Sequence, residues 1–204
     1  MKFQSFFCGW VLLFFLTPFV SCESKQSKAE KKEIPLSDTT KFYPIEKFIQ
    51  DEIQYVDLRD FIITETKLQE NGDTVFAKNV NSTKQLTKDE FISAATEIKN
   101  TAVWFSNNKH LFKETVFQDL GTESYTINYQ TDKADIKSID LLLNEQTNLP
   151  KRLFIRMIRK EGEITSTIQY SWVTGKQYSI AKSIKKSTAL IEQSNKTIQW
   201  INKP

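Results

Sequence analysis

The stretch KRLFIRMIRK, residues 151–160, repeats with the period of two that is typical of a β-strand. Its odd positions carry the apolar residues Leu153, Ile155 and Met157. Its even positions mix cationic and apolar side chains: Arg152, Phe154, Arg156, Ile158 and Lys160. Because successive side chains of a strand point to opposite faces, both faces of this predicted strand are partly apolar.

Further stretches with the same period lie on both sides of residues 151–160. We predict strands where apolar residues alternate, at 125–129, 139–143, 164–172 and 178–184. Turn signals separate them, at Asn148-Leu149-Pro150, Glu161-Gly162 and Thr174-Gly175. Parallel neighbours would each need a crossover of about a dozen residues, so these short connections predict an antiparallel meander.

Two helices are predicted upstream of these strands. In the first, which follows Pro44, apolar residues from Ile45 to Val56 recur at three- and four-residue steps. The second begins at Thr87, because Thr87 and Glu90 have the spacing of a capping box. An apolar stripe follows it, formed by Phe91, Ile92, Ala95 and Ile98.

A hairpin is predicted between the two helices. Its strands would cover residues 61–69 and 73–80, joined near Asn71-Gly72, the dipeptide that most readily adopts a tight hairpin turn. Taken with the later strands, this predicts an α+β fold in which two helices pack on one face of a large, curved antiparallel sheet.

The N-terminal residues have the three parts of a secretory signal peptide. Lys2 supplies the charge, the block from Trp10 to Leu16 is apolar, and Ser21 is the small residue before the cut. A membrane-spanning helix is the alternative, but it needs about 20 mainly apolar residues, and Pro18 shortens the helical part. We therefore expect residues 1–21 to be removed as a signal peptide.

The residues Phe19-Val20-Ser21-Cys22 resemble the lipobox of bacterial lipoproteins, although Phe19 replaces the leucine that is usual there. The resemblance implies that Cys22 receives a diacylglyceryl group, that signal peptidase II cuts before it, and that its amino group is acylated. Two or more acyl chains anchor a protein stably in a bilayer. The layout of the whole chain is also similar to that of small lipoproteins of Gram-negative bacteria.

The lipobox resemblance implies a location in the cell envelope, lipid-anchored, with the outer membrane as the expected membrane and the periplasmic or surface side left open. Residues 22–41 would then be the lipidated cysteine and a flexible tether, because they contain too few hydrophobes to offset the entropy of ordering. Residues 42–204 fit a single α+β domain.

Composition and motifs speak against several classes of function. The net charge of +3 is too small to indicate nucleic-acid binding. His110 is the single histidine and lies in a polar connector, so we expect neither a catalytic triad nor a metal site, and no cofactor. Three pairs of carboxylates could serve a glycosidase, but each lies at a predicted turn or helix end, where solvated acids are ordinary: Asp57 and Asp60, Asp132 and Asp135, and Glu161 and Glu163.

Cationic and apolar side chains occur together on two of the predicted strands. We expect seven of them to share one concave face: Arg152, Phe154, Arg156, Ile158, Tyr178, Ile180 and Lys182. Such a face could accept an anionic amphiphile, with apolar groups along its chain and cations at its headgroup. The alternative is that the face lies under the helices and that its long cationic side chains reach water at the rim.

Residues 135–172 also resemble the periplasmic lipoprotein carriers and related lipid-binding half-barrels. The shared features are strand 139–143, the Leu-Pro turn at 148–150 and strand 153–158. We expect a lipid-anchored, extracytoplasmic binding or scaffold domain without catalytic activity, which meets the membrane through Cys22 and a protein partner not identified by the sequence. The alternative function is a carrier or sensor that holds a lipid or other hydrophobic ligand in the curved sheet.

Overall fold

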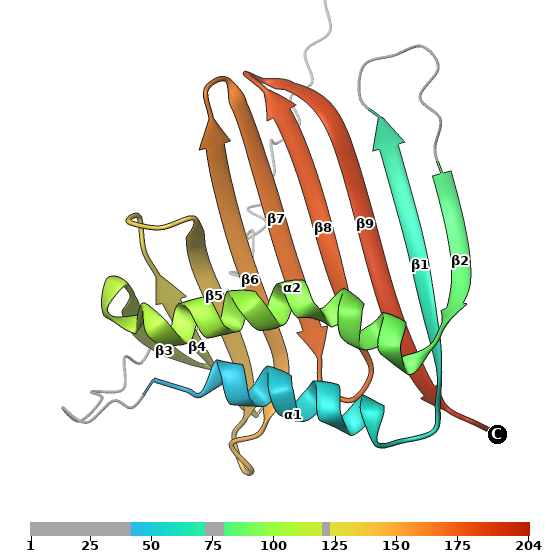
Figure 1. The fold of residues 1–204 in the computed structure, drawn as a ribbon. Helices are drawn as coiled ribbons and strands as arrows, with labels where there is room; N and C mark the ends of the chain where they lie inside the picture. The colour runs from blue at the N-terminus through green and yellow to red at the C-terminus, as the bar shows by residue number, and fades with distance from the viewer. Residues whose placement is uncertain (1–41, 72–79, 120–122) are drawn as a thin grey trace, which may run out of the picture. The chain divides into compact units, whose positions relative to one another are not determined.

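The computed structural model describes residues 42–71, 80–119 and 123–204. The predicted signal peptide, the lipidation site Cys22, the tether and most of the predicted strand 73–80 lie outside these residues. Within the described ranges, two α-helices pack against one face of a single antiparallel sheet of nine strands (Figure 1). The predicted α+β fold with two helices on one large sheet is therefore confirmed.

The helices are α1 (Ile45–Asp57) and α2 (Lys88–Asn107), and a short 3-10 helix, η1 (Lys109–Leu111), follows α2. The strands are, in chain order, β1 (Phe61–Asn71), β2 (Val80–Leu86), β3 (Lys113–Asp119), β4 (Ser124–Gln130), β5 (Ile136–Asn144), β6 (Pro150–Glu161), β7 (Ile164–Val173), β8 (Gln177–Lys186) and β9 (Ala189–Asn202). Their order across the sheet is β2-β1-β9-β8-β7-β6-β5-β4-β3.

Strands β4 to β8 form the predicted meander, β3 and β9 extend it at its two ends, and β9 then connects it to the β1–β2 hairpin. β9 pairs with β1 along the full length of β1, from Phe61 opposite Asn202 to Asn71 opposite Glu192. The sequence analysis did not identify β9, because the middle of this strand, from Glu192 to Thr197, is entirely polar. A strand with a polar middle thus holds the N-terminal hairpin to the rest of the sheet.

The β1–β2 hairpin differs from its prediction. Among the described residues the last pair between the two strands is Gln69 opposite Val80, and this register is not centred on Asn71-Gly72 as a tight turn there would require. β9 supplies backbone partners to β1 as far as Asn71. The second strand covers Val80–Leu86 within the described residues, and residues 73–79 of the predicted strand lie outside them.

Both helices begin where the sequence predicts. α1 follows Pro44 and buries an apolar stripe made of Ile45, Phe48, Ile49 and Val56. At the start of α2, Thr87 and Glu90 form the predicted capping box, in which the Thr87 amide donates to the Glu90 carboxylate at 2.8 Å. Of the predicted stripe on α2, Phe91, Ala95 and Ile98 are buried, whereas Ile92 is exposed.

The core lies between the helices and the sheet and is rich in aromatic rings. Trp172 stacks on Tyr178 with 5.0 Å between ring centroids, and Phe91 of α2 meets Tyr178 and Trp200 edge-on. Glu52 of α1 reaches into this core, where its Oε2 accepts hydrogen bonds from Trp172 Nε1 at 2.9 Å and from the Gly175 amide at 2.8 Å. The buried carboxylate therefore connects α1 to the β7–β8 turn.

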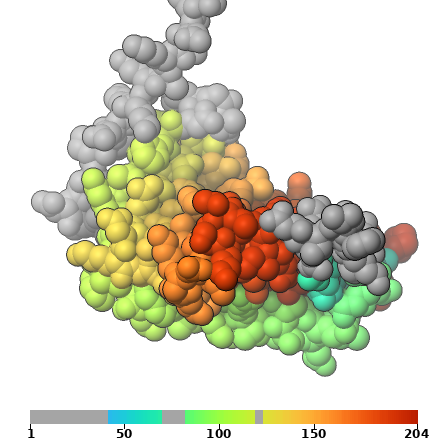
Figure 2. Space-filling model, turned by 90° about the horizontal axis from the view of Figure 1, so that it is seen from above, coloured from blue at the N-terminus to red at the C-terminus, as the bar shows by residue number. Residues whose placement is uncertain are grey.

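The helices do not cover the whole length of the strands. They cross the sheet near one end, and the β6–β7 and β8–β9 hairpins project beyond them (Figure 1). Seen from above, these hairpin ends, orange and red, lie side by side (Figure 2). The face that carries the core under the helices therefore continues past α2.

Candidate functional site: a groove beside α2

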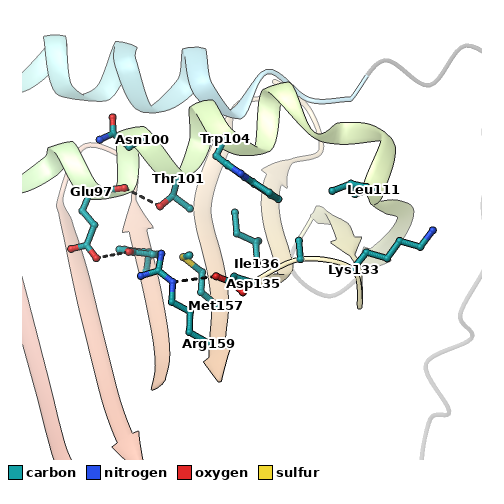
Figure 3. Close-up of a pocket in the computed structure, with 12 residues that line it drawn as sticks. Glu97, Asn100, Thr101, Trp104, Leu111, Lys133, Asp135, Ile136, Met157 and Arg159 are labelled. Atoms are coloured by element: carbon teal, nitrogen blue, oxygen red, sulfur yellow. Dashed lines mark hydrogen bonds and ion pairs between the residues drawn. The ribbon is translucent and has the colours of Figure 1, made fainter. Parts of the chain in front are cut away.

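A groove of about 410 Å³ lies between α2 and the sheet, next to the loop that joins β4 to β5. Its apolar lining comes from both sides (Figure 3). Trp104 and Leu111 line it from α2 and η1, and Ile136 and Met157 line it from β5 and β6. A concave site of this size is within the range of small-molecule pockets.

Spacing along the chain places these residues together. On α2, Glu97, Asn100 and Trp104 follow one another at steps of three and four residues, which puts them on one side of the helix. On the sheet, Ile136 pairs directly with Met157, so both side chains point to the helix-covered face. The Trp104 indole is 39% exposed and therefore offers an aromatic ring to a ligand.

One polar contact crosses the floor of the groove. The Tyr170 hydroxyl donates to Glu97 Oε1 at 2.8 Å, and Lys182 Nζ forms an ion pair with the same oxygen at 3.3 Å. Burial raises the pKa of the Tyr170 hydroxyl above its ordinary value, and the hydrogen bond to Glu97 raises that pKa further. The hydroxyl thus stays protonated, and it holds Glu97 in place.

A second polar pair lies at the groove's edge. Arg159 Nε donates to Asp135 Oδ2 at 3.3 Å, and both side chains are more than half exposed. An ion pair this exposed contributes little to folding, so either group can turn toward a ligand at small cost. The groove therefore combines an apolar lining with an acidic group at its floor and a cation at its edge.

The seven residues that the sequence analysis placed on one face do not lie together. Register aligns Leu153 with Trp172 and Trp172 with Tyr178, whereas Phe154 aligns with Ser171 and Ser171 with Ser179. The even positions of β6 and the even positions of β8 therefore face opposite sides of the sheet. The prediction of a single mixed face is wrong, because one residue of register reverses every side chain of a strand.

The two halves of the predicted face have different surroundings. Arg152, Phe154, Arg156 and Ile158 lie on the face away from the helices, where the Arg152 guanidinium covers the Phe154 ring at 4.2 Å. Tyr178 and Ile180 are buried in the core, at 0% and 2% exposure. Lys182 lies on the helix side and pairs with Glu97 at the groove.

The sequence analysis did not identify the groove residues. The sequence patterns above include Asp135 only as one of a pair of carboxylates, and they assign no role to Glu97, Trp104 or Arg159. A usable signal was present, because Trp104 is a large aromatic residue three and four positions from polar Thr101 and Asn100 on a predicted helix. Which strands pass beneath that side of α2 depends on long-range pairing.

His110 is exposed on η1. Among the residues that the structure describes, no group of three or more His, Cys, Asp or Glu side chains is placed to hold a metal ion. Within the same ranges, neither α-helix has both the length and the apolarity needed to cross a bilayer.

The chain was compared with protein-family models, curated proteins and solved structures. No family model, no curated protein and no solved structure matches it.

Proposed function

We propose that this protein is a lipid-anchored, extracytoplasmic binding domain that holds a small, partly apolar ligand in the groove beside α2 and performs no chemistry on it. The observation that carries the proposal is the groove itself, with Trp104, Met157 and Ile136 on its walls. The anchor rests on the lipobox-like residues that end at Cys22. The tether would let the domain stand clear of the membrane that holds it.

A ligand at the margin of the sheet fits this molecule better than a ligand enclosed at its centre. Under the helices, Trp172, Tyr178 and Trp200 are in ring contact with one another or with Phe91. A carrier that enclosed an acyl chain there would have to separate these rings. Beside α2, by contrast, the groove is already open.

The polar groups of the groove support binding over catalysis. Glu97 is held by Tyr170 and Lys182, and Asp135 is held by Arg159. A general base must reach the proton that it removes, and Glu97 already accepts a hydrogen bond from Tyr170 and an ion pair from Lys182. Asp135 is exposed and faces Arg159, so its carboxylate is available as a ligand contact. Both carboxylates are arranged to orient a polar group on a ligand.

Native mass spectrometry of the full chain, purified from the membranes of cells that make it, tests the proposal. Asn100 lies on the groove side of α2 and is exposed, so Asn100→Trp should fill the groove without disturbing the core. Lys99→Trp is the matched control, because Lys99 is the neighbouring exposed residue and does not line the groove. Circular dichroism should show that both variants fold.

We expect a non-covalent adduct on the unmodified protein and on Lys99→Trp, and its loss from Asn100→Trp. The covalent mass should also correspond to a chain that begins at Cys22 and carries acyl groups. An adduct that Asn100→Trp retains would place the ligand outside the groove. An unmodified protein with no adduct, or with a chain that is not acylated at Cys22, would contradict the corresponding half of the proposal.

A further inference from the structure

A second hollow, of about 220 Å³, lies on the helix-covered face beyond α2, over β8, β9 and β1. Three lysines from three adjacent strands line it, and we call it the lysine hollow: Lys67 of β1, Lys182 of β8 and Lys196 of β9. Register places all three on the side of the sheet that carries Tyr178 and Ile198, because Ile198 and Lys196 are two residues apart on β9. This side is the one that the helices cover further along the strands.

The lysines are closer together than charge repulsion alone would favour. Lys67 is directly opposite Lys196 in the pairing of β1 with β9, and like charges at directly opposed positions destabilise a sheet. On the other side of β9, Ile180 is opposite Lys196, and Lys182 follows two residues later on the same face. The sheet therefore concentrates cations where a charge-neutral pair would be more stable.

Three carboxylates around the hollow match the three lysines in number, but they are not paired with them one to one. Glu65 forms an ion pair with Lys67 at 3.1 Å, and Glu97 forms one with Lys182 at 3.3 Å. Glu192 also lines the hollow, and its Oε1 accepts a hydrogen bond from Gln69 at 3.3 Å. Each of these three carboxylates thus has a partner other than Lys196.

Lys196 is the one lysine of the hollow that forms none of these ion pairs. Among the described residues no carboxylate comes within ion-pair distance of Lys196, although its side chain is partly buried. Burial lowers the pKa of its ammonium group, because the charged form loses hydration there. Glu65 and Glu97 favour the charged form of Lys196 from a distance, but their ion pairs are with Lys67 and Lys182. A charge that is partly removed from water and makes no direct ion pair gains most from an anion delivered by a ligand.

We propose that the lysine hollow binds a small oxyanion, a phosphate or carboxylate group, with Lys196 as its main contact and with Lys67 and Lys182 beside it. Each lysine offers up to three donors on a flexible stem, and the Ser194 hydroxyl and Gln69 amide can add neutral donors from the same hollow. The volume suits one anionic group. The inference does not require that the groove beside α2 be occupied.

Isothermal titration calorimetry of the full chain tests this inference. The protein would be held in a neutral detergent and a phosphate-free buffer, and titrated with inorganic phosphate, with acetate, and with dihexanoylphosphatidic acid below its micelle concentration. Sodium chloride would keep the ionic strength constant, so that screening does not change during the titration. Lys196→Met removes the main contact. Lys160→Met is the matched control, because Lys160 is exposed and lies on the opposite face of the sheet.

We expect saturable binding of phosphate or acetate to the unmodified protein and to Lys160→Met, with affinity about tenfold or more weaker in Lys196→Met. Tighter binding of the phosphatidic acid than of inorganic phosphate would identify a lipid headgroup as the source, and equal affinities would identify a free anion. No saturable binding to the unmodified protein would overturn the proposal. Equal binding by Lys196→Met would overturn it as well, and a thermal melt would confirm that this variant is folded.

Discussion

On one face of the sheet, the part under the helices is apolar and buried, and the part beyond them is charged. The change occurs between one residue on that face and the next. On β8, Tyr178 and Ile180 are buried, and the next residue on that face, Lys182, is exposed. On β9, Trp200 and Ile198 are buried, and the next one, Lys196, carries a charge. The position of α2 decides where core ends and surface begins, because the strands themselves continue without a break.

The two parts also contribute differently to the molecule. Under the helices, contacts between large apolar rings dominate, and burial of such side chains supplies most of the stability of a domain. Beyond α2, the contacts are ion pairs between partly exposed groups, such as Lys182 with Glu97, which contribute little. The charged residues beyond α2 can therefore exchange their ion-pair partners for a ligand, while the apolar residues under the helices keep the domain folded.

The largest expected effect comes from the centre. Trp172 is fully buried, and its indole donates to Glu52, so Trp172→Ala should cost about 3 to 5 kcal/mol, a large part of the 5 to 15 that a domain has. Trp104→Ala at the groove should cost much less, because that ring is 39% exposed. Urea denaturation would measure both losses. Equal losses of stability in the two variants would contradict the distinction between the buried centre and the groove.

A smaller loss should follow from removing the buried carboxylate. Glu52→Ala leaves Trp172 Nε1 and the Gly175 amide without an acceptor, at about 1 to 3 kcal/mol for each orphaned donor. Both donors meet the same oxygen, Oε2, so the single side-chain oxygen of Glu52→Gln can accept both. Thermal melting should therefore rank the unmodified protein and Glu52→Gln close together, well above Glu52→Ala. A melting temperature of Glu52→Gln as low as that of Glu52→Ala would show that the charge matters more than the acceptor.

The smallest effect concerns the margin and its dependence on pH. The pKa of Lys196 is lowered by burial from its ordinary 10.5, so below the folded-state pKa the folded protein bears the cost of a poorly hydrated charge. As the pH rises through that pKa toward 10.5, the folded state releases the proton first and the cost disappears. Lys196→Met should therefore be the more stable protein near pH 7. The difference in unfolding free energy between it and the unmodified protein should shrink toward about pH 10.

Comparison of urea midpoints at several pH values would measure this difference in stability. Lys160→Met serves again as the control, and its difference from the unmodified protein should not change with pH, because Lys160 is exposed. A Lys196→Met advantage that grew as the pH rose would contradict the assignment of burial as the cause.

Local patterns in the sequence were sufficient for much of this fold. The capping box at Thr87, the apolar stripe of α1 and the turn at Thr174-Gly175 each depend on neighbours within a few residues, and each lies where it was predicted. Gly175 has a φ of +66°, which a glycine adopts without strain, so the signal for that turn is built into the residue itself.

The rest depends on contacts between residues far apart in the chain. Alternation identifies the two faces of a strand, but it does not show which face of β6 lies beside which face of β8, and the predicted ligand face was wrong for that reason. The groove likewise requires α2 to pass over β5 and β6. For Lys196, alternation alone could not tell whether a helix covers its position.

The pairing of β9 with β1 means that the chain cannot complete its sheet in the order in which it is made. Gln69 and Glu192, which contact each other at 3.3 Å, are 123 residues apart. At about 5 to 20 residues per second, the ribosome needs roughly 6 to 25 seconds to add that stretch. During that interval one edge of β1 lacks its partner strand, and unpaired edges are where chains aggregate. A nascent chain with this connectivity gains from a chaperone, or from export before folding, until its last strand has been synthesised.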